Sequence, residues 1–398
     1  MDHTEEIVIV GAGIAGLAVA VGLHRKGLGS VVLESSDKLR AAGFALTVWG
    51  NAWRALDALG VGDSLRRNHL RLQTAVVSSA SSASLVTKLP AKEHEVRCVR
   101  RNLLVEALAG ELPHGTIRYS SKVVAMEDSG ESKLLHLADG STLKAKVVIG
   151  CDGINSVVSK CLGLKPSTFS GRHAARGFTV LPNGHGMKPE IRHYNGEGFR
   201  AGVLPCDEKS LYWFFTWASN EEKERIHDAL KLKEFVLGKL KASEIPGQVV
   251  EIIEKSELSS VASASLRYRS PLNLLSGNIC KGNTCVTGDA FHPMTPDLGQ
   301  GGCLALEDGV VLARCLGDAL CGGGNGEEEH RNRRVEEALK EYEKARKWRA
   351  FRLVVGSYAF GFVQESGNWF LRLVRERILA GFMVEWLFIA ASFDCGKL

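Results

Sequence analysis

A glycine-rich turn near the N-terminus constrains the fold of this chain more than any other feature. The segment Gly11-Ala12-Gly13-Ile14-Ala15-Gly16 follows a β-branched run at 5–10 and precedes an apolar stretch at 17–27. The first glycine permits a tight turn, the second lets the backbone approach a pyrophosphate, and the third lets a helix pack closely on a strand. The sequence therefore predicts a strand, a turn and a helix whose N-terminus binds the phosphates of a dinucleotide.

An acidic residue follows at the expected distance from this turn. The next strand-like run, at 30–34, ends in Glu34, eighteen residues beyond Gly16. A carboxylate at that point accepts hydrogen bonds from a ribose and repels a 2′-phosphate. The site is therefore expected to prefer FAD or NAD over NADP.

Two later segments are further candidates for the site. In the first, a β-branched strand ends in Asp152 and Gly153 before a short helix, and such a turn can be structural or functional. In the second, at 288–303, a strand delivers Asp289, two prolines stiffen the loop, and glycines open a long helix. This second segment predicts another helix N-terminus that attracts anions, with Asp289 able to bind a sugar or ribityl hydroxyl.

The pattern of elements predicts an α/β fold. A Rossmann-like βαβ domain is expected at 1–75, 98–165 and 276–325, and a mixed or antiparallel substrate sheet at 76–97 and 166–275. The remaining residues, 326–398, are expected to be helical, with a long solvated charged helix at 331–355. An apolar segment at 378–393 is too short to span a membrane, so a buried helix is favoured over membrane contact.

Composition narrows the range of functions. The chain has 398 residues, of which 45% are hydrophobic and 24% charged, as in ordinary globular proteins, and its net charge of +5 gives no reason to expect nucleic acid as a partner. Its ten cysteines contain no CxxC pair or zinc-type spacing, so we expect reduced thiols and no metal site. The N-terminus lacks the pattern of a signal or transit peptide, which favours a cytoplasmic protein.

Taken together, these three motifs in this order resemble the single-component FAD-dependent aromatic hydroxylase family, typified by para-hydroxybenzoate hydroxylase. Within it, the long segment at 288–302 is most similar to plant FAD-dependent monooxygenases related to salicylate hydroxylase and zeaxanthin epoxidase. The resemblance covers nearly the whole chain. It implies that the turn from Gly11 to Gly16 holds the pyrophosphate of FAD and that Glu34 holds the ribose.

The resemblance also assigns further cofactor contacts. It places Arg101 near the flavin and pyrophosphate, and the backbone of Val124 beside the adenine. It assigns Asp152 and Gly153 to contacts with FAD and NAD(P)H, and Asp289 to the ribityl chain. The loop expected along the isoalloxazine contains Pro296, Gly299, Gly301, Gly302 and Cys303. Many relatives have Asn in place of Cys303, which matters only if the side chain, rather than the backbone, contacts the flavin.

The activity implied by the resemblance is oxygen insertion. NAD(P)H reduces FAD, O2 forms a flavin C4a-hydroperoxide, and one oxygen atom enters a small aromatic or cyclic substrate. The cofactor carries this chemistry, so no catalytic side chain is identified, and His292 is interpreted as structural. The alternatives are an epoxidase of an isoprenoid-type substrate, for which the apolar segment at 350–393 could offer a lipid-facing approach, and a flavin-binding redox sensor without turnover. A monomer or weak dimer is expected.

Substrate specificity is expected to reside on the sheet between 170 and 275. Charged and aromatic candidates there are Arg176, Arg200, Tyr212, Trp213, Phe214, Phe215 and Trp217. Alternation along a strand sends only half of such residues to one face. Sequence alone leaves open which half lines the pocket.

Overall fold

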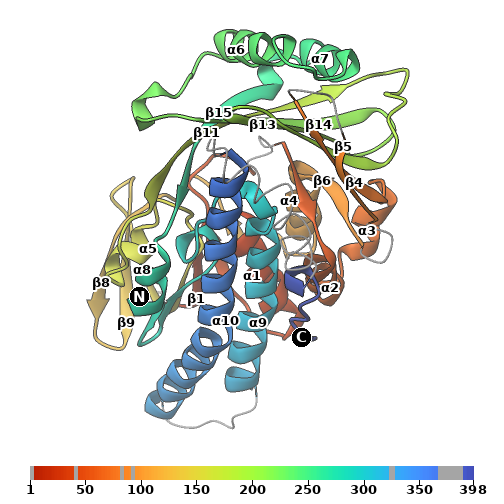
Figure 1. Ribbon diagram of the computed structural model, residues 1–398. Coiled ribbons are helices and arrows are strands. Elements are labelled where there is room, and N and C mark those ends of the chain that lie inside the picture. The colour runs from red at the N-terminus through yellow and green to blue at the C-terminus, as the bar shows by residue number, and fades with distance from the viewer. Residues whose placement is uncertain (1–3, 40–43, 81–84, 91–94, 322–327, 366–388) are drawn as a thin grey trace.

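Two large sheets and a helical layer form the frame of the protein (Figure 1). The computed structural model describes residues 4–39, 44–80, 85–90, 95–321, 328–365 and 389–398. Most of the apolar segment expected at 378–393 lies outside these residues. Among the described residues, no helix is long and apolar enough to cross a membrane.

The first sheet carries the glycine turn. Its strand order is β16-β17-β10-β1-β2-β7, with the hairpin β8–β9 joined to β10 through β9. Strand β1 runs parallel to both β2 and β10, and β10 runs parallel to β17, as in a dinucleotide-binding fold. The strands are β1 (Thr4–Val10), β2 (Val31–Leu33), β7 (Ile117–Arg118), β8 (Val123–Ser129), β9 (Ser132–Leu137), β10 (Thr142–Gly150), β16 (Cys280–Lys281) and β17 (Thr284–Val286).

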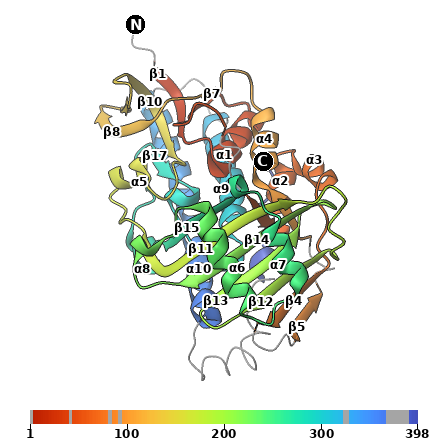
Figure 2. The same ribbon diagram turned by 90° about the horizontal axis from the view of Figure 1, so that it is seen from above.

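Among the described residues, the second sheet is almost entirely antiparallel and has the order β15-β11-β14-β13-β12-β4-β5, with only β4 and β12 parallel. Its strands are β4 (Thr74–Ser79), β5 (Leu85–Pro90), β11 (Thr168–Val180), β12 (Glu190–Asn195), β13 (Phe199–Pro205), β14 (Ser210–Ala218) and β15 (Val261–Tyr268). Helices α6 (Ala229–Lys241) and α7 (Gly247–Glu254) cover its outer face (Figures 1 and 2). These two sheets confirm the predicted fold class. Strands β4 and β5 join the later strands in this sheet, and the division into domains stays a prediction.

Helices α1 (Ile14–Arg25) and α9 (Gly301–Cys321) pack closely together beside the first sheet. A Cβ atom added at Gly309 would lie 2.6 Å from that of Ala18, so small residues allow the close approach. The shorter elements are α2 (Gly50–Ala58), α3 (Gly62–Arg67), α4 (Arg101–Gly110), α5 (Val157–Cys161) and α8 (Pro271–Ser276), with a small sheet of β3 (Ala45–Val48) and β6 (Arg97–Arg100).

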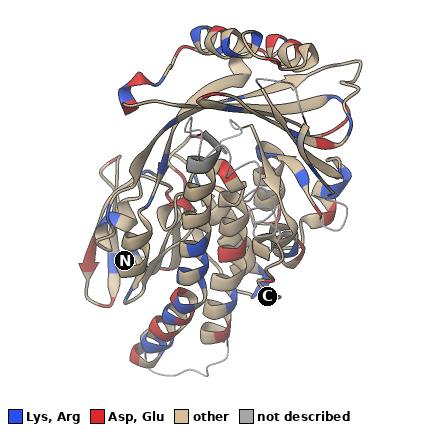
Figure 3. Cartoon of the chain, in the orientation of Figure 1, with Lys and Arg blue, Asp and Glu red and all other residues tan. Residues whose placement is uncertain are grey.

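The predicted charged helix is present as α10 (Glu328–Glu365), but its charges are not all solvated. Figure 3 shows many charged residues along α10 and on α6. Arg346 is fully buried, with its guanidinium 2.7 Å from Asp308 Oδ1 and 2.6 Å from Glu307 Oε2 of α9. Ionic contacts therefore fix α10 against α9. The sequence interpretation missed them because the acidic partners lie on another helix.

Candidate active site

The glycine turn has the geometry that its spacing predicts. Gly11 has φ of +104°, and a Cβ there would lie 2.6 Å from the carbonyl oxygen of Cys151. A Cβ at Gly16 would lie 1.9 Å from the carbonyl oxygen of Gly11, so both positions require glycine for packing. By contrast, nothing lies within 4 Å of a Cβ built on Gly13, and this leaves open space where α1 begins.

Glu34 is fixed beside this turn. The residue is 5% exposed, and Oε2 accepts a hydrogen bond from the Ala12 N–H at 2.9 Å. Oε1 accepts from the backbone N–H of Ser36 at 2.9 Å. The segment just before Val124 is hydrogen-bonded to Glu34, since the Ser121 N–H donates to the Glu34 carbonyl at 2.8 Å. The end of β2 therefore presents an oriented carboxylate at the edge of the glycine turn.

The Asp-Gly motif at the end of β10 adjoins the turn from the other side. A Cβ on Gly11 would lie 3.2 Å from the Cα atom of Asp152. Asp152 Oδ2 accepts hydrogen bonds from the N–H groups of Val157 and Val158, at 2.7 and 3.4 Å, at the start of α5. Burial raises the pKa of Asp152 despite these bonds. The Asp152 side chain therefore has a structural role at the start of α5. Gly153, with φ of +78°, forms the turn that follows it.

Asp289 lies on a tightly held loop and lines a cavity. The Asp308 carboxylate accepts hydrogen bonds from the Gly288 N–H at 3.1 Å and the Thr287 hydroxyl at 3.0 Å. On the other side of Asp289, the Ala290 carbonyl accepts from Arg269 Nη2 at 3.0 Å. The Asp289 side chain is exposed where it lines the cavity. Partial desolvation by the surrounding protein raises its pKa, an effect opposed by His292, Arg176 and Arg101.

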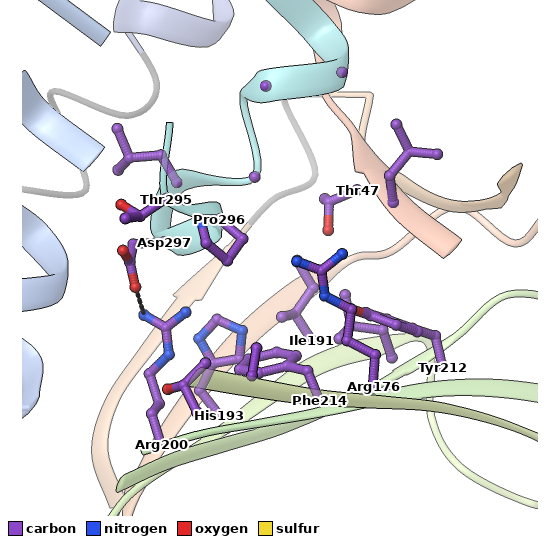
Figure 4. Close-up of a pocket in the computed structure, with 18 of the residues that line it drawn as sticks. Thr47, Arg176, Ile191, His193, Arg200, Tyr212, Phe214, Thr295, Pro296 and Asp297 are labelled. Atoms are coloured by element: carbon purple, nitrogen blue, oxygen red, sulfur yellow. Dashed lines mark ion pairs between the residues drawn. The ribbon is translucent and has the colours of Figure 1, made fainter. Parts of the chain in front are cut away.

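The described residues enclose a cavity of about 320 Å³ between the second sheet and the loop 294–302 (Figure 4). Gly299, Gly301 and Gly302 line it, as the expected cofactor loop should. Cys303 does not, because its Sγ donates to the carbonyls of Thr47 and Gly299 at 3.5 Å, and burial raises its pKa to about 12. An Asn at this position, which the resemblance leads us to expect in many relatives, would therefore replace a buried side chain outside the cavity.

Strand alternation resolves which candidates of the second sheet face the cavity. Its lining residues include Arg176, Arg200, Tyr212 and Phe214. The other candidates, Trp213, Phe215 and Trp217, belong to a separate apolar core with residues of α6 and α7. The sequence predicted the alternation, and the register of the strands decides its phase.

Several residues of the site escaped the sequence interpretation. Asp297 is buried at the cavity edge, and its carboxylate lies 2.6 Å from Arg172 and 3.5 Å from Arg200. Burial opposes its ionisation, but these two guanidinium groups lower its pKa. His193 and Thr47 also line the cavity. Only Asp297 had a sequence signal, since it belongs to the same proline- and glycine-rich loop as Pro296. His292 is fully buried, with Nε2 2.5 Å from Asp308, which supports its structural interpretation.

Comparison with known proteins places this arrangement in a family. A sequence profile described as an FAD binding domain matches residues 4–355. The chain belongs to the FAD-dependent aromatic hydroxylase family. The chain is 48% identical to Monooxygenase 2 from Arabidopsis thaliana over 405 residues, covering 100% of this chain and 99% of that protein. It is 38% identical to Monooxygenase 1 from the same plant, covering 98% of this chain and 99% of that protein.

The fold of the chain is also similar to that of a solved structure. Klebsiella pneumoniae HpxO complexed with FAD and uric acid matches with a TM-score of 0.84 and 21% sequence identity, covering 97% of this chain and 96% of that chain. The residues of the chain fit FAD as its cofactor. The open space at Gly13 admits a pyrophosphate beside the N-terminus of α1, Glu34 is held next to it, and Asp289 lines the cavity.

Proposed function

We propose that this family member is an NAD(P)H-dependent hydroxylase that inserts one oxygen atom from O2 into a small aromatic or cyclic compound. The observation that carries the proposal is the cavity between the second sheet and the loop 294–302. Aromatic and aliphatic side chains form much of its wall, with a few polar groups among them, as is usual for sites that bind small organic molecules. When bound, FAD supplies the transfer of electrons from NAD(P)H and the activation of O2.

The proposal assigns the cofactor to the motifs predicted from the sequence. The N–H groups at the start of α1 bind the pyrophosphate, Glu34 binds the adenosine ribose, and Asp289 binds the ribityl hydroxyls. The other proposed contacts are Ile14, Ala15, Arg101, Val124, Asp152, Gly153, Pro296, Gly299, Gly301, Gly302 and the backbone of Cys303. The position of Asp289 supports its part, because the loop on both sides is hydrogen-bonded to other elements.

The side chains of the cavity bind and orient the substrate, and they exclude water. Leu46, Leu204, Met294 and Phe360 come from four separate parts of the chain and line one cavity. Such a lining keeps water away from the reacting atoms and strengthens the electrostatic contacts within the cavity. Phe214 offers an aromatic surface on which a planar ring can stack.

The test is a spectrum followed by a turnover assay. The purified protein should show a flavin absorption spectrum that NADPH or NADH bleaches under anaerobic conditions, faster in the presence of a substrate. Under 18O2, the product should then contain one labelled oxygen atom. Failure to bind FAD contradicts the proposal, and bound flavin that never bleaches favours the redox-sensor alternative. An epoxide product would favour the epoxidase, whose suggested lipid-facing segment at 350–393 lies about half outside the described residues.

A cytoplasmic location and a monomeric or weakly dimeric state stay predictions of the sequence. Size-exclusion chromatography with light scattering and imaging of a fluorescent fusion would test them.

A further inference from the structure

Four residues form a straight row across the cavity side of the second sheet. Arg176 of β11 is paired with Phe214 of β14, Phe214 with Gly202 of β13, and Gly202 with His193 of β12. Residues directly opposite one another on neighbouring strands project from the same face. The row therefore sets a guanidinium at one end and an imidazole at the other, three strands apart.

The glycine in this row makes room for an aromatic ring. A Cβ on Gly202 would lie 2.3 Å from Cε1 of Phe214 and 3.0 Å from Cδ2 of His193. The Phe214 ring therefore lies over β13, and its edge-to-face contact with His193 has ring centroids 5.4 Å apart. Between the two polar ends, the row offers a continuous apolar surface.

Arg176 differs from the other arginines of this site. Arg172 and Arg200 are ion-paired with Asp297. Arg176 points into the cavity and makes no hydrogen bond or ion pair with any residue that the structure describes (Figure 4). A guanidinium in this position is a donor suited to a ligand oxygen that carries negative charge.

His193, at the other end of the row, can accept a hydrogen bond. Its imidazole lines the cavity, and neither ring nitrogen bonds to another side chain or backbone group in the described part of the chain. Burial and the nearby Arg200 guanidinium lower the pKa of His193 to about 3. The ring is therefore neutral at physiological pH, and one of its nitrogens is an acceptor.

We propose that this row selects the substrate, which is a planar aromatic compound with an ionised oxygen bound by Arg176 and a hydroxyl or ring N–H that donates to His193. Its ring stacks on Phe214 above Gly202. The inference rests on the proposed function, because it takes the cavity as the substrate site. His193 is assigned as the residue that distinguishes a hydrogen-bond donor from an isosteric group that cannot donate.

The test uses matched pairs of ligands and the FAD-loaded protein. The pairs are 4-hydroxybenzoate with 4-methoxybenzoate, and 6-hydroxy-2-naphthoate with 6-methoxy-2-naphthoate. Phenol and 2-naphthol lack the carboxylate and complete the series. Dissociation constants are measured by isothermal titration calorimetry and by the change in flavin absorbance, without NAD(P)H. In at least one pair the hydroxy compound should bind about tenfold more tightly, because methylation leaves the imidazole acceptor unpaired.

Two variants separate the ends of the row. His193→Phe should reduce the hydroxy preference to within about twofold, and Arg176→Gln should remove the advantage of the carboxylates over the phenols. The control is Arg192→Gln, the neighbouring position on the opposite face of β12, where Nη2 lies 3.2 Å from Glu190. This control should leave both preferences unchanged, and retained FAD absorbance shows that each variant is folded.

The proposal is overturned if none of the four acids binds, if no hydroxy preference exists, or if the preference survives in His193→Phe. These outcomes are distinct from failure of the proposed function. A protein that oxidises NAD(P)H and yet ignores these ligands contradicts the inference alone. A protein that binds them without taking up FAD contradicts the proposed function.

Discussion

The carboxylate of Asp308 lies 2.5 Å from Nε2 of His292, and both side chains are fully buried. The same carboxylate accepts a hydrogen bond from Nε of Arg346 at 2.7 Å and from the Gly288 N–H at 3.1 Å. Burial opposes ionisation of Asp308, but the charges of His292 and Arg346 hold its pKa well below the usual range. One side chain of α9 thus connects α10 to the loop that carries Asp289.

Asp308→Asn should lower both the stability of the protein and its affinity for FAD. Loss of the charge leaves Arg346 partly unpaired in the interior, which costs about 3–5 kcal/mol for a broken buried ion pair. Urea unfolding and fluorescence titration with FAD measure the two effects. The control is Asp318→Asn on the same helix, where the carboxylate is 64% exposed and pairs with Lys26, so its change should stay below about 1 kcal/mol. Equal effects of the two variants would contradict the role of Asp308.

The functions of the second and third glycines of the turn, Gly13 and Gly16, can be separated by substitution. Gly13→Val places its side chain in open space, so the protein without cofactor should keep its stability while FAD binds at least about tenfold more weakly. Gly16→Ala should instead destabilise the protein without cofactor, because its Cβ would overlap the Gly11 carbonyl. Thermal unfolding with and without FAD distinguishes the two. Unchanged FAD affinity in Gly13→Val would rule out pyrophosphate binding at this turn.

Gly202→Ala should change ligand binding in the cavity without changing the affinity for FAD. The new Cβ would overlap the Phe214 ring, and overpacking of this kind costs about 1–3 kcal/mol. Ligand binding should weaken while the FAD dissociation constant stays within about twofold of that of the original protein. The control is Gly238→Ala on the exposed side of α6, where nothing lies within 4 Å of the new Cβ and the change should stabilise the helix by up to about 1 kcal/mol.

The dependence of stability on pH should report the state of His193. Its pKa is about 3 in the folded protein and about 6.5 when unfolded, so the unfolded chain binds the extra proton between these values. The free energy of unfolding therefore falls as pH decreases from about 6.5 towards 3. His193→Gln should show a smaller loss between pH 7.5 and pH 5 in urea titrations. An identical loss in both proteins would mean that His193 is not buried in its neutral form.

Local sequence patterns were sufficient to predict the geometry of the glycine turn and of the loop after Asp289, and insufficient to predict which residues of the second sheet line the cavity. The turn from Gly11 to Gly16 and the loop after Asp289 are contiguous, so their spacing carries their geometry. The partners of Asp308 are different, because Arg346 lies on another helix and the pairing depends on how α9 meets α10. Nothing local in the sequence indicates that contact.

Register explains the rest of what the sequence could not predict. The alternation from Leu211 to Trp217 was visible, but its phase depends on the pairing of β14 with β11 and β13. No sequence pattern indicates a role for His193, because it lies on a short strand without a motif. It enters the site only because β12 aligns it with Gly202.

The alternation of side chains along β14 has an evolutionary consequence, because adjacent residues of this strand contact different parts of the protein. Phe214 meets the ligand space, whereas Trp213 and Phe215 belong to the core beneath α6 and α7. Mutations at cavity-facing positions can therefore accumulate with little cost to the sheet's outer core, and the glycine turn from Gly11 to Gly16 lies on other strands. A lineage with this architecture can alter the lining of the cavity by changing alternate residues of a few strands while the glycine turn and the loop after Asp289 are inherited intact.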